Sequence, residues 1–158
     1  MEISTPVTRF LDDRRIPYHL FQHSGQVHTI EEAARQRGER PEQIVRSILF
    51  RLSSEEFLIV LIAGPGQISW KALRVYLNQS RLTMASEEEV LRVTGYRIGA
   101  VSPFGLPQPV RTLVDESVLA EEEISIGSGQ RGLAVILQKK DFIQAMGNIE
   151  VGKFGDFN

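Results

Sequence analysis

The sequence predicts an α+β fold in which helices flank a mixed, mainly antiparallel and curved sheet. Helix-like and strand-like segments follow one another irregularly along the 158 residues, and several strand-like segments are neighbours in sequence. This pattern excludes the regular alternation of a doubly wound sheet. The composition, with 42% hydrophobic and 24% charged residues, is that of a globular protein with its own core. The length favours a single domain over residues 1–158.

Capping residues and prolines set the boundaries in the N-terminal half. Pro6 follows Thr5 and suits the first turn of a helix, which Pro17 stops. Thr29 and Glu32 have the spacing of a capping box. In order, we expect a helix over 5–16, a strand over 18–22, a helix over 29–38, a helical turn from Pro41 and a hairpin of strands 46–52 and 57–63 around the loop Ser53–Glu56.

Similar signals divide the C-terminal half. Ser69 caps a helix, Ser86 and Glu89 form a second capping box, and Gly95 closes the helix that follows. In order, we expect a helix over 69–77, a short strand over 81–84, a helix over 86–95, strands over 97–101, 110–114, 123–126 and 133–137, and a helix over 139–146. The tail over 152–158 is expected to be loosely held.

Composition excludes several classes of protein. The chain has no cysteine, which excludes disulfide scaffolds, thiolate metal sites and cysteine nucleophiles. The N-terminus has no apolar signal-peptide core, and the longest apolar stretch, Phe57–Ala63, is too short to span a bilayer. We therefore expect a cytoplasmic protein with no membrane partner. A net charge of −2 argues against strong nonspecific nucleic-acid binding and leaves a transient contact on a local patch open.

Two glycine-rich segments are candidate parts of a site. Residues 127–132 match G-x-G-x-x-G, but a strand-like segment follows where the dinucleotide fingerprint needs a helix. We therefore expect a turn between two strands, whose free N–H groups could hold an oxyanion. Residues 99–105 carry Ser102 at a bend. That hydroxyl either shapes a pocket or merely ends a strand, because the segment does not match a nucleophile elbow.

Three histidines and one arginine are the charged or ionisable residues that we first consider as candidates for a site. His19, His23 and His28 fit no strong zinc spacing, so no metal site is expected. Arg46 begins a strand whose next residues are apolar. Its side chain either extends to solvent or faces a pocket, and the local sequence favours the first.

The combination of these motifs resembles one family. The pieces are Arg46 opening its strand, Thr94-Gly95-Tyr96 with Gly99, the segment 102–105, and the segment 127–133. Together they resemble the YbaK/EbsC family of aminoacyl-tRNA deacylases, which is similar to the editing domain inserted in bacterial prolyl-tRNA synthetases. The likeness covers roughly residues 4–150. It implies a barrel-like mixed sheet, and an enzyme that hydrolyses the ester between a wrong amino acid and the tRNA 3′ end without a metal or organic cofactor.

The resemblance also implies site residues. Those expected to act in catalysis are Arg46, Ser102 and Gly129. Those expected to contact the substrate are Tyr18, Thr94, Gly99, Ala100, Val101, Pro103, Phe104, Ser128 and Arg131. Many relatives carry Lys where this chain has Arg46. Arginine keeps the positive charge and can hold a carbonyl or a phosphate, but it cannot serve as a base.

Three functions stay open on the sequence alone. The leading one is a free-standing trans-editing hydrolase for tRNA carrying a small amino acid, of the Ala- or Cys-tRNA(Pro) type. The second is an inactive module that binds the tRNA 3′ end or aminoacyl-adenosine, and the third is a hydrolase of small esters. The expected partners are aminoacyl-tRNA, held transiently at its 3′ end, and an aminoacyl-tRNA synthetase. Both a monomer and a homodimer stay open.

Overall fold

The protein is described by a computed structural model that covers residues 3–52 and 55–157. The helical segments of this part are α1 (Pro6–Asp13), α2 (Ile30–Arg37), the 3-10 turn η1 (Pro41–Gln43), α3 (Trp70–Leu77), α4 (Glu87–Thr94), the 3-10 turn η2 (Glu116–Leu119) and α5 (Lys139–Met146). Its strands are β1 (His19–Gln22), β2 (Val45–Leu52), β3 (Phe57–Ala63), β4 (Gln67–Ile68), β5 (Leu82–Met84), β6 (Arg111–Asp115), β7 (Glu123–Gly127), β8 (Leu133–Gln138), β9 (Glu150–Gly152) and β10 (Gly155–Asp156).

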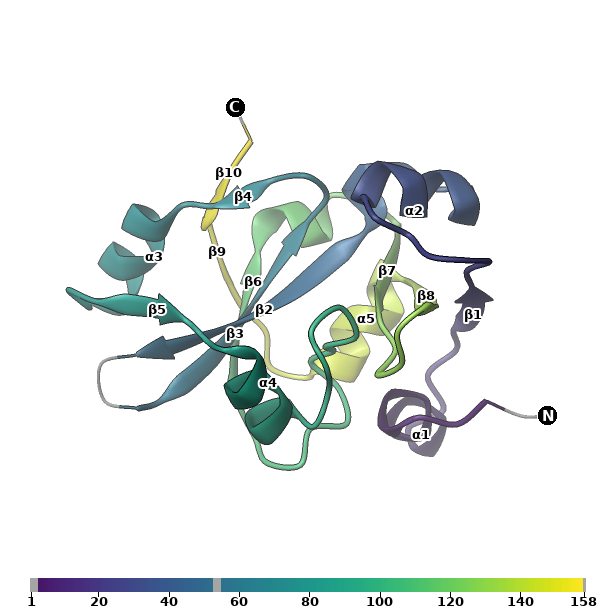
Figure 1. The fold of residues 1–158 in the computed structure, drawn as a ribbon, viewed down its shortest axis with the longest axis horizontal. Helices are drawn as coiled ribbons and strands as arrows, with labels where there is room; N and C mark the ends of the chain where they lie inside the picture. Colours follow the sequence, from purple (N-terminus) through teal and green to yellow (C-terminus); the bar gives the residue numbers. More distant parts are fainter. Residues whose placement is uncertain (1–2, 53–54, 158) are drawn as a thin grey trace.

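The strands form two main sheets, which Figure 1 shows with α3 and β5 at one end of the molecule and α1 and β1 at the other. A five-stranded sheet has the order β5-β2-β3-β6-β9, and a three-stranded sheet has the order β1-β8-β7. Most pairs are antiparallel, whereas β6 pairs in parallel with β3 and with β9. A bridge between Ile44 and Ser125 joins the two sheets. The α+β class with a mixed, mainly antiparallel sheet is confirmed.

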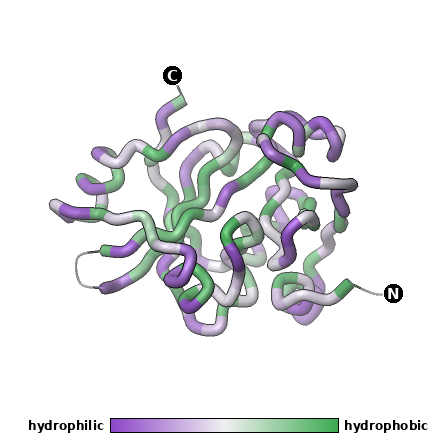
Figure 2. The backbone as a smooth tube through the Cα atoms, viewed as in Figure 1, coloured by the Kyte–Doolittle hydropathy of each residue, from purple (hydrophilic) through white to green (hydrophobic). Residues whose placement is uncertain are grey.

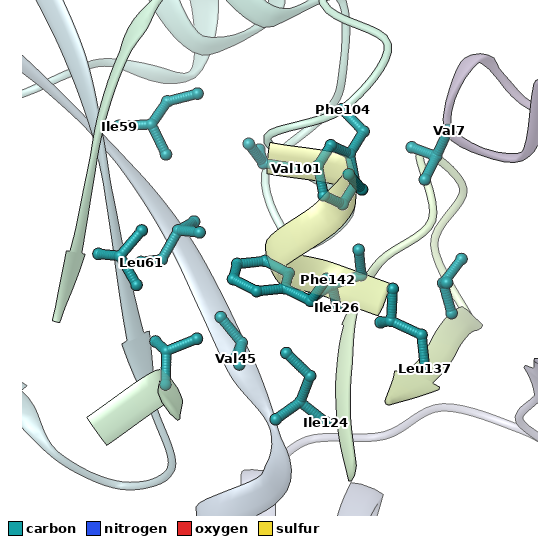
Figure 3. Packing of buried hydrophobic residues seen from close by; sticks show 14 of the residues in the cluster. Val7, Val45, Ile59, Leu61, Val101, Phe104, Ile124, Ile126, Leu137 and Phe142 are labelled. Carbon is teal, nitrogen blue, oxygen red and sulfur yellow. The ribbon is translucent and has the colours of Figure 1, made fainter. Parts of the chain in front are cut away.

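Strand β3 organises the core because both of its faces are buried. Alternate residues, such as Ile59 and Leu61, pack between the two sheets, while Leu58 and Val60 pack on the opposite face, under α3. This explains the continuous apolar run of the strand, and hydrophobic residues gather in the same central strands in Figure 2. Figure 3 shows Phe142 of α5 pointing into the space between the sheets. None of the helices in the described residues is long and apolar enough to cross a membrane.

The helix ends follow the local signals closely. The hydroxyl of Thr5 accepts a hydrogen bond from the N–H of Thr8, and Ser86 and Glu89 make a reciprocal capping box. The expected box at the start of α2 is only half formed. The hydroxyl of Thr29 accepts from the N–H of Glu32, as expected, but the Glu32 carboxylate accepts from the N–H of His28 instead.

Two expectations are wrong. The expected strand over 97–101 is a turn, in which the N–H of Ala100 donates to the carbonyl of Arg97 and Gly99 has a φ of +93°, which excludes strand geometry. The expected loosely held tail over 152–158 contains the last residue of β9 and the whole of β10 instead. Phe154 between them is fully buried, and both its N–H and that of Gly155 donate to the Asp115 carboxylate. The remaining strands form as expected, although Ser53 and Ser54 of the hairpin loop lie outside the described residues.

Candidate active site

Two neighbouring cavities lie beside the hairpin of β7 and β8, and the inner one also borders β2. The inner cavity, of about 280 Å³, has an apolar wall made of Ile44, Val45, Ile48, Val101, Ile126 and Leu133 and polar groups from Arg37, Arg46, Ser47 and Ser125. The outer cavity, of about 620 Å³, is lined mainly by residues 23–28 and 131–133. Arg37, Gly99 and Leu133 line both cavities. The two cavities therefore meet at these three residues.

Close backbone packing shapes the inner cavity. Gly127, at the end of β7, lies so near the turn over 99–101 that a Cβ atom added to it would be 2.0 Å from the Val101 carbonyl oxygen. Gly99 has a φ of +93°, a conformation that favours glycine. The two segments that carry these glycines are thus held against each other, and both contribute to the wall.

Arg46 lies on β2 opposite Ile62 of β3 and contributes to the inner cavity. One of its terminal nitrogens, Nη2, donates to the Gly66 carbonyl. Its Nε atom is buried without a hydrogen-bond partner among the described residues. Burial lowers the pKa of the guanidinium from its ordinary value. Arg46 therefore faces the cavity rather than extending freely to solvent, and it retains one unused donor.

The sequence analysis did not single out Arg37, which lies in the last turn of α2. Its Nε donates to Nε2 of His23 at 2.9 Å, and its Nη1 donates to Oγ of Ser125 at 2.6 Å. The other ring nitrogen of His23, Nδ1, is 2.8 Å from Oε1 of Gln36. Burial lowers the pKa of Arg37, while the nearby Glu39 carboxylate opposes this shift. The site thus holds two half-buried cations.

Unpaired polar atoms gather at this site. Among the described residues, the buried side-chain nitrogen and oxygen atoms without a hydrogen-bond partner are Nε of Arg46, Oγ of Ser47 and both carboxylate oxygens of Glu39. Burial raises the pKa of Glu39, and the neighbouring Ser125 hydroxyl and Arg37 charge act in the opposite direction. Buried polar groups in proteins are normally paired. Arg46 and Ser47 line the inner cavity, whereas Glu39 lines neither of the two cavities.

Some residues expected from the sequence meet at these cavities. Arg46, Gly99 and Val101 line the inner cavity, and Gly99 and Arg131 line the outer one. Nε of Arg131 donates to the Ile98 carbonyl at 2.8 Å, which fixes this cation against the turn over 99–101. Ala100 is buried behind the cavity wall.

Other expected residues lie behind the cavities, with their polar groups already paired. The hydroxyls of Thr94 and Ser128 donate to the backbone, and that of Ser102 accepts from the N–H of Phe104. The N–H of Gly129 donates to the Ala100 carbonyl at 2.9 Å. The amide of Gly129 is therefore not free to hold an oxyanion, contrary to the sequence-based expectation.

Three expected residues lie elsewhere. Pro103 and Phe104 line a separate cavity of about 430 Å³ with Phe10 of α1 and Arg14, the residue that follows this helix. The Tyr18 hydroxyl donates to the Asp12 carboxylate at 2.8 Å, and burial, helped by that carboxylate, raises the pKa of Tyr18 to about 12. The structure brings none of the three to the two cavities that meet at Arg37.

The sequence of this chain is similar to a known family and to several known proteins. A family model described as an aminoacyl-tRNA editing domain matches residues 24–145. The proline–tRNA ligase of Kosmotoga olearia is 35% identical over 106 residues, which cover 67% of this chain and 18% of the ligase. The uncharacterized protein YwhH of Bacillus subtilis is 31% identical over 72% of this chain and 71% of its own length. This chain thus spans about a fifth of the length of the proline–tRNA ligases that it matches.

The fold is also found among solved structures. The crystal structure of a candidate trans-editing enzyme for prolyl tRNA synthetase matches with a TM-score of 0.86 and 23% sequence identity. The match covers 99% of this chain and 100% of the other. At this level of identity the likeness shows a shared fold.

Proposed function

Because this chain belongs to the family of aminoacyl-tRNA editing domains, we propose that it acts as one domain that hydrolyses misacylated tRNA in trans. The proposed substrate is a tRNA that carries a small wrong amino acid, of the Ala- or Cys-tRNA(Pro) type. The match over 71% of YwhH supports action as a separate protein, and the matches to proline–tRNA ligases support the choice of tRNA. An aminoacyl-tRNA synthetase is the proposed partner.

The observation that carries this proposal is the pair of cavities that meet at Arg37, Gly99 and Leu133. The end of an aminoacyl-tRNA has two parts, an amino acid and a terminal nucleoside, joined by one ester. The small inner cavity suits the amino acid, and the larger outer cavity suits the nucleoside. We assign the selection of small side chains to the shape of the inner cavity, because an editing site rejects the amino acids that cannot enter it.

The polar groups fit ester hydrolysis. An aminoacyl ester is already activated, so its hydrolysis needs a placed water and stabilisation of the tetrahedral oxyanion. Arg46 lines the inner cavity and brings a positive charge to it, and we assign this guanidinium the role of anchoring the aminoacyl group. Ser102 and Gly129, whose hydrogen bonds stay within the protein, act by holding the loops in place.

The test is a deacylation panel. Purified protein is incubated with tRNA(Pro) and other tRNAs charged with Ala, Cys, Ser, Thr or Pro, and ester loss is timed against buffer. We expect rapid loss of one mismatched small amino acid and strong loss of activity in Arg46→Ala. Arg51→Ala is the matched control, because Arg51 lies on the same strand and pairs with Glu89 away from both cavities.

The alternatives give different results. Saturable binding of an aminoacyl-adenosine analogue without turnover would support an inactive binding module. Equal hydrolysis of simple amino-acid esters and charged tRNA would support a small-ester hydrolase. Unchanged activity of Arg46→Ala in a folded protein would contradict the role assigned to Arg46.

A further inference from the structure

A charged residue, Arg37, lies at the junction of the two cavities. If the amino acid occupies the inner cavity and the nucleoside the outer one, the ester that joins them lies where the cavities meet. Three residues line both cavities, and Arg37 is the charged one among them, beside Gly99 and Leu133. We propose that Arg37 is the catalytic cation of this site, which contacts the ester carbonyl and stabilises its oxyanion. This inference rests on the proposed function.

Hydrogen bonds fix the orientation of the Arg37 guanidinium. Nε donates to Nε2 of His23 and Nη1 donates to Oγ of Ser125. Because Nε2 of His23 accepts this bond, the imidazole proton is on Nδ1 and donates to Oε1 of Gln36. These two bonds use Nε and Nη1 of Arg37, and Nη2 takes no part in them. The network therefore positions the group while one terminal nitrogen stays available to a ligand.

The surroundings keep the charge of Arg37 in place without neutralising it. The Glu39 carboxylate is close enough to oppose the effect of burial on the pKa of Arg37. No ion pair within 4.0 Å joins Glu39 to Arg37 in the part of the chain that the structure describes. A preorganised charge in a partly buried site stabilises a developing oxyanion far better than the same charge in water.

The proposed step balances with water as the co-reactant. The water oxygen adds to the ester carbonyl carbon, and the carbonyl electron pair moves onto the carbonyl oxygen, which becomes an oxyanion facing Nη2 of Arg37. Collapse re-forms the carbonyl and breaks the bond to the ribose oxygen. The proton released by the attacking water ends on that ribose oxygen, so the products are a free amino acid and a tRNA with its hydroxyl restored.

The two cations have different places in this scheme. Arg46 lines the inner cavity only, and its Nη2 donates to the Gly66 carbonyl. Arg37 lines both cavities. Its Nη1 donates to the hydroxyl of Ser125, which lies on β7. We therefore expect loss of Arg46 to weaken the binding of the aminoacyl group, and loss of Arg37 to slow the chemical step.

Single-turnover kinetics on the amino acid found in the deacylation panel test the proposal. Arg37→Met should lower the rate constant at saturating enzyme about 100-fold, the loss typical of an oxyanion donor. The enzyme concentration that gives half the maximal rate should change by less than about threefold, because the interaction forms only in the transition state. Arg35→Met, an exposed arginine on the same helix, should behave as the wild type.

Two further variants separate chemistry from folding. Arg37→Ala should regain activity when a guanidinium salt is added, and not when a sodium salt of equal ionic strength is added. Ser125→Ala removes the bond to Nη1 and should slow the rate constant less than Arg37→Met does, at unchanged half-saturation. Wild-type rates in a folded Arg37→Met overturn the inference and leave the editing function standing. A wild-type protein that deacylates none of the charged tRNAs overturns both.

Discussion

Replacing Gly127 by alanine tests how closely the hairpin of β7 and β8 packs against the turn over 99–101. The added Cβ would lie 2.0 Å from the Val101 carbonyl oxygen, 2.8 Å from its carbonyl carbon and 3.0 Å from the Ala100 carbonyl carbon. All three are backbone atoms, so no side chain can rotate away. The backbone of one segment must then move by about 1 Å or more to reach an acceptable contact.

This backbone displacement should lower the free energy of unfolding of Gly127→Ala. Overpacking typically costs about 1–3 kcal/mol, and a clash with three backbone atoms of one turn places Gly127→Ala at about 3 kcal/mol or above. For a chain of this length, each kcal/mol lowers Tm by about 2–4 °C, so Tm should fall by about 6–12 °C. The two segments form adjacent parts of the inner cavity wall. Deacylation should therefore fall even at temperatures where the variant is fully folded.

Urea unfolding and deacylation rates, measured on the same preparations, give the result. Gly132→Ala is the matched control. It lies in the same hairpin with a φ of +81°, but a Cβ there would meet no atom within 4 Å, so it should cost only the about 1–2 kcal/mol of a left-handed conformation. If Gly127→Ala is no less stable than Gly132→Ala, the close packing described here is wrong.

Three other changes test separate features. Phe154→Ala removes a fully buried ring and should lower the free energy of unfolding by about 3–5 kcal/mol. Urea unfolding should show this as a lower midpoint at an unchanged m value. A near-neutral effect would instead support the prediction that the tail is loosely held. Tyr96→Phe removes the hydroxyl that donates to the Phe104 carbonyl at 2.5 Å. It should lower the free energy of unfolding by about 1–3 kcal/mol, and an unchanged urea midpoint would contradict a stabilising role for this bond. Glu39→Gln should stabilise the protein at neutral pH. Burial raises the folded pKa of Glu39 above its ordinary 4.5, so the wild type loses stability as the pH rises through that folded pKa. The gain of the variant should shrink when unfolding is measured below pH 4.5, and a gain independent of pH would contradict this cause.

Local chemistry made much of the fold predictable. Helix ends depend on neighbouring residues, so Thr5, Ser69 and Ser86 could be identified as caps from the sequence. The apolar run of β3 likewise indicated a strand over 57–63. The failures came from long-range contacts. The turn over 97–101 depends on its packing against Gly127, and Phe154 is held by Asp115, which lies 39 residues away in sequence.

The site was less predictable than the fold for the same reason. Arg46 and Gly99 were expected at the site and line its cavities. Arg37 lies in the last turn of α2, where a basic residue is already explained by the helix dipole. Its partner Ser125 is 88 residues away. Only the folded chain brings the two together, and no local pattern in the sequence indicates that they meet.

The pairing of the C-terminal strands sets an order of events while the chain is being synthesised. Strand β4 emerges from the ribosome early, but its partner β10 is made about 90 residues later. The edge of β6 likewise stays unpaired until β9 is complete. Until then the nascent chain exposes open strand edges and the apolar surface that Phe154 later covers, both of which favour association between unfinished chains. A chain of this fold therefore completes its sheets only when its last residues have been made.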